Sequence, residues 1–242
     1  MQYGKLFLIP SSLGGGELNW IIPNQVRNCI ANLAYFVVEH PKTARHFLKQ
    51  IEHQQPIQAI KLLTLDKYTP VNELNTLLEP IYAGNDMGLL SEAGCPAIAD
   101  PGANLVRLAH EKQIQIIPLV GPSSILLALM ASGLNGQSFS FHGYLPIDKA
   151  ACIKKIIQIE SESLKCNQTQ IFIETPYRNK KLFELLTTNC QGNTHLCIAS
   201  NLTLMNETIK TKTIKDWQYC QPDLEKKPTV FLMHCYRMSQ ST

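Results

Sequence analysis

The stretch of sequence that decides the fold is MGLLSEAGCPAIADPG, residues 87–102. Its first four residues are a short apolar run, which predicts a fully buried strand. Residues 91–99 then follow neither helical nor strand periodicity, and they predict an irregular loop. Asp100 and Pro101 are typical of a helix start, with Asp100 as the N-cap. A buried strand, a loop and a helix in direct succession favour a largely parallel α/β sheet.

The same alternation continues in both directions along the chain. Strands are predicted at residues 6–9, 35–38, 114–118, 170–174, 195–199, 207–214 and 229–235, and helices at residues 26–33, 44–51, 71–81, 105–109, 125–131, 150–163 and 179–187. No long apolar helical pattern separates the last two strands, which predicts an antiparallel or mixed sheet in the second half. We therefore expect an α/β protein of two domains, residues 1–119 and 120–242, with a mostly parallel sheet in the first and a mixed sheet in the second.

The composition is that of a folded globular protein. Of 242 residues, 45% are hydrophobic and 17% are charged, and 22 Lys and Arg stand against 19 Asp and Glu. This gives a formal charge of +3, which is far from the strong positive charge of a dedicated nucleic-acid binder.

The eight cysteines predict free thiols. No two of them are closer than seven residues in the sequence, so there is no CxxC pair of the kind found in zinc ribbons. The histidines show no metal-ligand spacing either, and we expect no metal. Residues 6–9 are too short for the apolar region of a signal peptide, and no apolar stretch is long enough to cross a bilayer. These features predict a cytoplasmic protein that makes no contact with a membrane.

Three loops follow predicted strands and are expected to meet at one edge of the sheet. They are residues 10–16, 91–102 and 121–124, and open α/β sheets bind ligands at the carboxyl ends of their strands. The glycines of the first loop do not form GxGxxG, because the sixth position is Asn19, and no loop ends as a P-loop does. A nucleotide pyrophosphate is therefore poorly supported. Ser123 and Ser124, at a helix N-terminus, suit a carboxylate, and the plain alternative is that they only cap the helix.

Several of these segments resemble one known family. The segments are residues 90–102 and 118–124, residues 143–146 (GYLP), residues 9–14 (IPSSLG), residues 174–178 (ETPYR) and residues 199–203 (ASNLT). Together they resemble the tetrapyrrole methylase superfamily, and within it the branch that methylates a ribose 2′-hydroxyl of small-subunit ribosomal RNA. The resemblance implies a shortened and divergent member of this branch. It further implies a homodimeric two-domain methyltransferase that binds S-adenosylmethionine in a cleft between its domains.

Carried over by position, the resemblance implies a set of residues that contact the cofactor. Apolar walls suit the adenine and the sulfonium methyl group, and donors suit the carboxylate. The implied residues are Pro10, Leu13, Ser91, Gly94, Cys95, Ile98, Ser123, Ser124, Ala199 and Thr229.

Methyl transfer to a hydroxyl needs one titratable group to remove a proton. Glu39 and His40 follow a predicted strand, and they are the catalytic candidates. Asp100 and Glu174 also lie at predicted strand ends or in cleft loops, although the helix cap is the stronger interpretation of Asp100.

The acceptor is left open by the sequence. Small basic clusters in the second half, such as residues 178–181 and 210–215, fit RNA or a ribosomal particle, and equally fit a solvated helix face. A small molecule such as a tetrapyrrole is the alternative acceptor. Residues 38–42 and 200–204 depart from the pattern of the branch at positions that we interpret as facing the substrate. This departure favours a third hypothesis, a catalytically silent protein that binds the cofactor and serves as an interaction partner.

Overall fold

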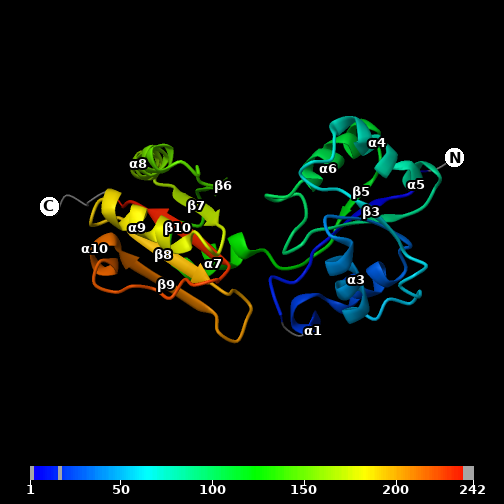
Figure 1. The fold of residues 1–242 in the computed structure, drawn as a ribbon, viewed down its shortest axis with the longest axis horizontal. Helices are drawn as coiled ribbons and strands as arrows, with labels where there is room; N and C mark the ends of the chain where they lie inside the picture. Colours follow the sequence, from blue (N-terminus) through cyan, green and yellow to red (C-terminus); the bar gives the residue numbers. More distant parts are fainter. Residues whose placement is uncertain (1–2, 16–17, 237–242) are drawn as a thin grey trace. The chain divides into compact units, whose positions relative to one another are not determined.

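The computed structural model describes residues 3–15 and 18–236, so Gly16 of the predicted first loop lies outside the described residues. The chain forms two compact units, Met1–Ser123 and Ser124–Thr242. Each unit contains one five-stranded sheet with helices packed against it (Figure 1).

The sheet of the first unit is entirely parallel. Its strands run in the order β3-β2-β4-β1-β5. They are β1 (Leu6–Ile9), β2 (Tyr35–Val38), β3 (Lys61–Thr64), β4 (Met87–Leu90) and β5 (Ile116–Pro118). The parallel α/β architecture predicted from the sequence is confirmed. The prediction missed β3, an edge strand with exposed Lys61 and Thr64 at its ends and no continuous apolar signal.

Helices cover both faces of this sheet, with α1 and α3 on one side and α4 and α6 on the other (Figure 1). The helices are α1 (Leu18–Ile21), α2 (Asn24–Ala31), α3 (Pro41–Gln50), α4 (Leu74–Leu77), α5 (Glu79–Tyr82) and α6 (Gly102–Glu111), with a 3-10 turn η1 (Val71–Glu73). Both faces are apolar: Phe36 packs toward α2 and α3, whereas Val37 packs toward α4.

The single helix predicted over residues 71–81 is wrong. The chain forms η1, α4 and α5 there, and the break between α4 and α5 falls just before Pro80, which has no N–H to donate to the preceding turn. The amides of Leu78 and Ile81 instead bond three residues back, to the carbonyls of Asn75 (3.2 Å) and Leu78 (2.9 Å). The apolar residues Leu74 and Leu77 of α4 and Ile81 of α5 still face the core, whereas Val71 of η1 is exposed.

The sheet of the second unit is mixed, as predicted. Its strands are β6 (Phe139–Tyr144), β7 (Thr169–Glu174), β8 (His195–Ser200), β9 (Thr208–Thr213) and β10 (Thr229–His234). Their order is β6-β7-β10-β8-β9, with β6 parallel to β7 and the other pairs antiparallel. The prediction missed β6, whose sequence FSFHGY mixes polar residues and a glycine into the strand.

The core of the second unit lies between this sheet and three helices. These are α8 (Lys149–Cys166), α9 (Asn179–Asn189) and α10 (Ile214–Trp217), and α7 (Ser124–Ser132) packs separately against β8, β9 and β10. Phe172 and Phe231 stack across neighbouring strands, with ring centroids 5.9 Å apart. The indole of Trp217 is buried and donates to the carbonyl of Leu196 at 2.8 Å. The apolar core therefore contains no unsatisfied indole.

The described residues contain neither a disulfide nor a cluster of metal ligands. All eight cysteines are unpaired, as predicted. Within residues 3–15 and 18–236, no three His, Cys, Asp or Glu side chains gather as a metal site would require. No helix among these residues is long and apolar enough to cross a membrane.

His234 makes the stability of the second unit depend on pH. Its side chain is fully buried and its Nε2 has no partner. Burial lowers the pKa of His234 below the usual 6.5; the backbone of Gln168 opposes this shift, and the neighbouring His195 adds to it. Below about pH 6.5 the unfolded state binds a proton at this histidine that the folded state does not. The unfolding free energy is therefore highest above about pH 6.5 and falls as the pH drops below it.

Urea unfolding followed by Trp217 fluorescence should show a lower unfolding free energy at pH 5.5 than at pH 7.5. The His234→Gln variant should lose less stability over this interval than the wild type. His110→Gln, which changes an exposed histidine on α6, is the control and should behave as the wild type does. An unchanged pH dependence in His234→Gln would contradict this assignment.

Candidate functional site

Three loops leave the carboxyl edge of the parallel sheet in the first unit. We call residues 10–15 after β1 the first loop, residues 91–101 after β4 the second loop, and residues 119–123 after β5 the third loop. Because β1 lies between β4 and β5 in the sheet, the three loops emerge side by side. Open α/β sheets place their ligand sites at this edge.

The first and second loops are joined by a two-residue antiparallel bridge. The amide of Ser11 donates to the carbonyl of Gly94 at 2.9 Å, and the amide of Gly94 donates to the carbonyl of Ser11 at 3.3 Å. The hydroxyl of Ser91 donates to the same Gly94 carbonyl at 2.8 Å. Ser11 and Ser91 are both buried. The bridge therefore fixes the second loop on the first with buried, satisfied hydrogen bonds.

The third loop locks onto the other two by close packing. A Cβ on Gly121 would lie 2.2 Å from Cγ of Pro10, so only glycine fits there. Gly94 has a φ of +73°, and a Cβ on it would lie 3.1 Å from Leu13. The thiol of Cys95 donates to the carbonyl of Pro122 at 3.4 Å, and burial raises the pKa of Cys95. Pro10, Leu13, Gly94 and Cys95, all predicted from the sequence, are thus gathered at one place.

The second loop holds an apolar side chain out toward solvent. Ile98 is 51% exposed, and it lies between Ala97 and Ala99, whose φ angles are +65° and +56°. Left-handed backbone at a non-glycine residue costs about 1–3 kcal/mol and is common at ligand sites. Asp100 stabilises this shape, because its Oδ1 accepts from the amides of Ala97 (3.1 Å) and Gly102 (2.6 Å).

Asp100 therefore anchors the second loop just before α6 begins. Burial raises the pKa of its carboxyl, and the two amide hydrogen bonds oppose that shift. The prediction that Asp100 is the N-cap and Pro101 the first helical residue is wrong by one position: Pro101 is the N-cap, and Asp100 bonds the first helical amide, that of Gly102, from the residue before it.

Ser123 ends the first unit and Ser124 is the first residue of α7 in the second. The two serines predicted as cofactor contacts therefore lie at the junction of the two units. The first amides of α7 have no partner within the helix, as at every helix N-terminus.

Ala199 and Thr229 do not point the same way. Thr229 pairs with Ser200 and Val230 with Ala199 on adjacent antiparallel strands, so the side chains of Ala199 and Thr229 face opposite sides of the sheet. The hydroxyl of Thr229 is 2.9 Å from that of Ser200 and accepts from Asn179 at 3.2 Å. This hydroxyl is engaged inside the second unit.

Two further polar residues of the second unit, Ser200 and Asn201, are also buried inside the fold. Ser200 and Asn201, interpreted from the sequence as facing the substrate, are only 1% and 6% exposed. The hydroxyl of Ser200 bonds that of Thr229, and the backbone amide of Asn201 donates to the carbonyl of Pro228 at 3.0 Å. The interpretation of these two positions as substrate contacts is therefore wrong, because their polar groups are buried in the fold.

Glu39 and His40 directly follow β2 at the same sheet edge as the three loops. The Nδ1 of His40 lies 3.5 Å from Oε1 of Glu92 in the second loop. Burial raises the pKa of Glu39, and the charge of His40 opposes that shift. Beside them is a hollow of about 70 Å³ that is lined by Ser11, Ser12, Ser91 and Glu92 of the loops and by residues of α3 such as His46.

Sequence reasoning missed Glu92 and Ser11. Glu92 is 52 positions from His40 and Ser11 is 80 from Ser91, since 92 − 40 = 52 and 91 − 11 = 80, so no local spacing links them. The only available signal was the prediction that the loops share one sheet edge.

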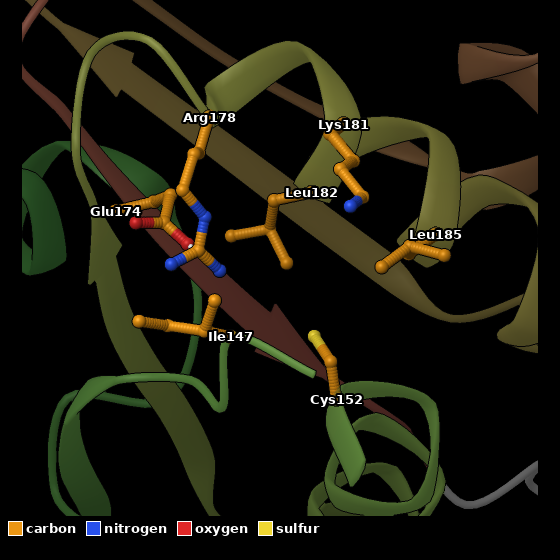
Figure 2. A pocket seen from close by; sticks show the side chains of 7 residues that line it. All are labelled: Ile147, Cys152, Glu174, Arg178, Lys181, Leu182 and Leu185. Carbon is orange, nitrogen blue, oxygen red and sulfur yellow. Dashed lines mark ion pairs between the residues drawn. The ribbon is translucent and has the colours of Figure 1, made fainter. Parts of the chain in front are cut away.

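Glu174 is removed from the set of catalytic candidates by its own contacts. Figure 2 shows Arg178, at the beginning of α9, reaching back over Glu174 at the end of β7, beside Ile147 and Cys152. The ion pair measures 2.8 Å, the Glu174 side chain is 1% exposed, and its second oxygen accepts from the amide of Thr175 at 2.7 Å. The space at this pair, about 10 Å³, holds one water at most. Glu174 therefore anchors its turn.

Known proteins share both the sequence and the fold. "Ribosomal RNA small subunit methyltransferase I" of Vibrio cholerae serotype O1 is 29% identical over 236 residues, which cover 96% of this chain and 77% of that protein. The protein of the same name from Haemophilus influenzae is 31% identical over 172 residues, covering 70% of this chain and 59% of that protein. No protein-family model matches the chain.

Solved structures define the class of fold. The methyltransferase CobJ superimposes with a TM-score of 0.63 at 18% identity, covering 96% of this chain and 94% of that one. Cobalt precorrin-4 methyltransferase superimposes with a TM-score of 0.60 at 14% identity, covering 95% and 94%. The fold is that of the tetrapyrrole methylases. Within them, the predicted resemblance to the small-subunit ribosomal RNA methyltransferases is confirmed.

Replacing Gly121 by alanine should break the contact between the third and first loops. The added Cβ collides with the rigid ring of Pro10, and such overpacking costs about 1–3 kcal/mol of unfolding free energy. Gly15→Ala is the matched control, because a Cβ there meets nothing within 4 Å, and it should stay within about 0.5 kcal/mol of the wild type. Equal stability of the two variants in urea would disprove the contact.

Proposed function

We propose that the protein is an S-adenosylmethionine-dependent methyltransferase that methylates a ribose 2′-hydroxyl of small-subunit ribosomal RNA. The observation that carries the proposal is the interlocked set of three loops at the carboxyl edge of β1, β4 and β5. It lies in a chain of which 96% aligns with a ribosomal RNA small subunit methyltransferase I. We also propose that the enzyme works as a homodimer in the cytoplasm, on the basis of the resemblance.

The residues of the first unit fit the chemical demands of this cofactor. Leu13 and the exposed Ile98 supply apolar surface for the adenine and the methyl group. Ser91 and Gly94 serve by fixing the backbone of the second loop. When bound, the cofactor supplies an electrophilic methyl group on a sulfonium.

The protein must then remove one proton from the acceptor hydroxyl. We assign this step to His40, because neutral imidazole is the usual base near pH 7 and its Nδ1 is oriented by Glu92. Nε2 is the atom that would accept the proton. The carboxylates of Glu39 and Glu92 would then stabilise the imidazolium by charge attraction.

The cofactor assignment predicts a defined loss of affinity for Asp100→Ala. Removing the carboxylate frees the strained second loop, because its two hydrogen bonds to backbone amides are lost. Losing side-chain bonds of this kind at a helix start costs about 0.5–2 kcal/mol, or about 2- to 30-fold in the dissociation constant for S-adenosylmethionine. Asp148→Ala is the matched control: Asp148 caps α8 by accepting from Ala151 at 2.9 Å, in the second unit. Calorimetric titration of both folded variants should show weaker binding only for Asp100→Ala. Equal affinities would refute the role of the second loop.

The transferase assignment predicts where the methyl group goes. With labelled S-adenosylmethionine, label should enter RNA as 2′-O-methylribose when the substrate is a small-subunit ribosomal particle or its protein-free RNA. His40→Ala should lower the turnover rate about 10²- to 10⁴-fold while cofactor affinity is retained. His110→Ala is the control and should keep full activity.

Other outcomes of this assay identify the competing hypotheses. Label in an added tetrapyrrole, with none in RNA, would replace the proposed acceptor by a small molecule. Saturable cofactor binding with no labelled product in RNA, tetrapyrrole or cell extract would support the catalytically silent protein. Full activity of His40→Ala would remove His40 as the base.

A further inference from the structure

The second unit carries a groove that none of the foregoing roles uses. It lies between the beginning of α9 and residues 221–226, and its volume is about 540 Å³. Pockets that take a ligand the size of a nucleotide fall in this range, about 300–1,000 Å³. Phe183 and Leu224, 6% and 4% exposed, supply its buried apolar side chains.

One wall of the groove is an exposed tyrosine on a fixed turn. Tyr177 is 83% exposed and follows Pro176, whose ring presets the backbone. The amide of Arg178 closes the turn on the carbonyl of Thr175 at 2.9 Å. The ion pair of Arg178 with the buried Glu174, drawn in Figure 2, anchors the turn to the end of β7. The turn therefore holds the ring of Tyr177 out toward solvent, and a ligand that binds to this ring need not order the backbone further.

The opposite wall is tied to the same helix. The side-chain amide of Asn179 donates to the carbonyl of Lys227 at 2.7 Å and to Thr229 at 3.2 Å. Asn179 is completely buried. Lys227 in turn pairs with Asp223, which neutralises one of the acidic residues of the groove and lowers the pKa of Asp223. Both walls are therefore joined before any ligand arrives.

The polar groups of the groove match a nucleotide. Lys180 and Glu184 line it, and among the described residues neither side chain takes part in an ion pair. A lysine suits a phosphate, whereas the carboxylate of Glu184 and the amide of Gln221 suit the edge of a base. Unpaired bases are held by stacking on exposed aromatic rings.

We propose that this groove binds an unpaired nucleotide of the RNA acceptor, with its base stacked on Tyr177 and its phosphate on Lys180. The inference rests on the proposed function, because it supplies the second unit with a contact to the same RNA. Specificity for unpaired RNA follows, since a base inside a duplex cannot offer its face to the ring.

The test uses the full chain and a short, fluorescently labelled single-stranded RNA of mixed sequence, with anisotropy as the readout. Tyr177→Ala should weaken binding about 5- to 100-fold, whereas Tyr177→Phe and Tyr177→Trp, which keep a ring to stack on, should bind as the wild type does. Tyr219→Ala is the control, because Tyr219 is equally exposed at 83% but does not line the groove.

Three results would overturn the proposal: unchanged affinity of Tyr177→Ala, a loss in Tyr177→Phe as large as in Tyr177→Ala, or duplex RNA bound as tightly as single strands. Titration with S-adenosylmethionine separates this proposal from the proposed function. Normal cofactor binding with RNA affinity insensitive to Tyr177 rejects the groove alone. Absence of cofactor binding with RNA affinity that depends on Tyr177 rejects the methyltransferase and keeps the groove.

Discussion

The bridge between Ser11 and Gly94 is the interaction on which the candidate site depends. Loops are normally the most mobile parts of a fold, because few buried contacts oppose their conformational entropy. Here the backbone of one loop pairs with that of another, the Ser91 hydroxyl bonds the same carbonyl, and Gly94 leaves room for Leu13. The parallel sheet brings the loops together, and the bridge turns that proximity into a fixed surface.

The sequence predicted eight of the ten strands that the described residues form, including the largely polar β9, and missed β3 and β6. Residues 6–9, 35–38 and 87–90 are continuous apolar or aromatic runs except for Gly88, and they form buried strands. Strand β3 has only two apolar residues between Lys61 and Thr64, and β6 mixes Ser140, His142 and Gly143 into its sequence, so neither has a continuous apolar run or a clear alternation. The helix predicted over residues 71–81 failed because its apolar spacing concealed the missing amide of Pro80.

The sequence could predict those parts of the candidate site that follow from the order of strands and loops along the chain. A strand followed by a loop fixes which sheet edge the loop occupies, so Pro10, Ser91, Gly94 and Cys95 could be grouped from the sequence. The partner of His40 could not, because the contact with Glu92 depends on how two loops pack. Ser200 and Asn201 show the opposite error: these polar residues were interpreted as facing the substrate, but both are buried, and the Ser200 hydroxyl bonds Thr229 inside the second unit.

The most direct test of the account is amide hydrogen exchange of the full chain with and without saturating S-adenosylmethionine. The cofactor should protect residues 10–15, 91–101 and 119–123 together, because the interlocked loops form one surface. Saturation of the protein with cofactor while all three loops exchange as fast as before would contradict it.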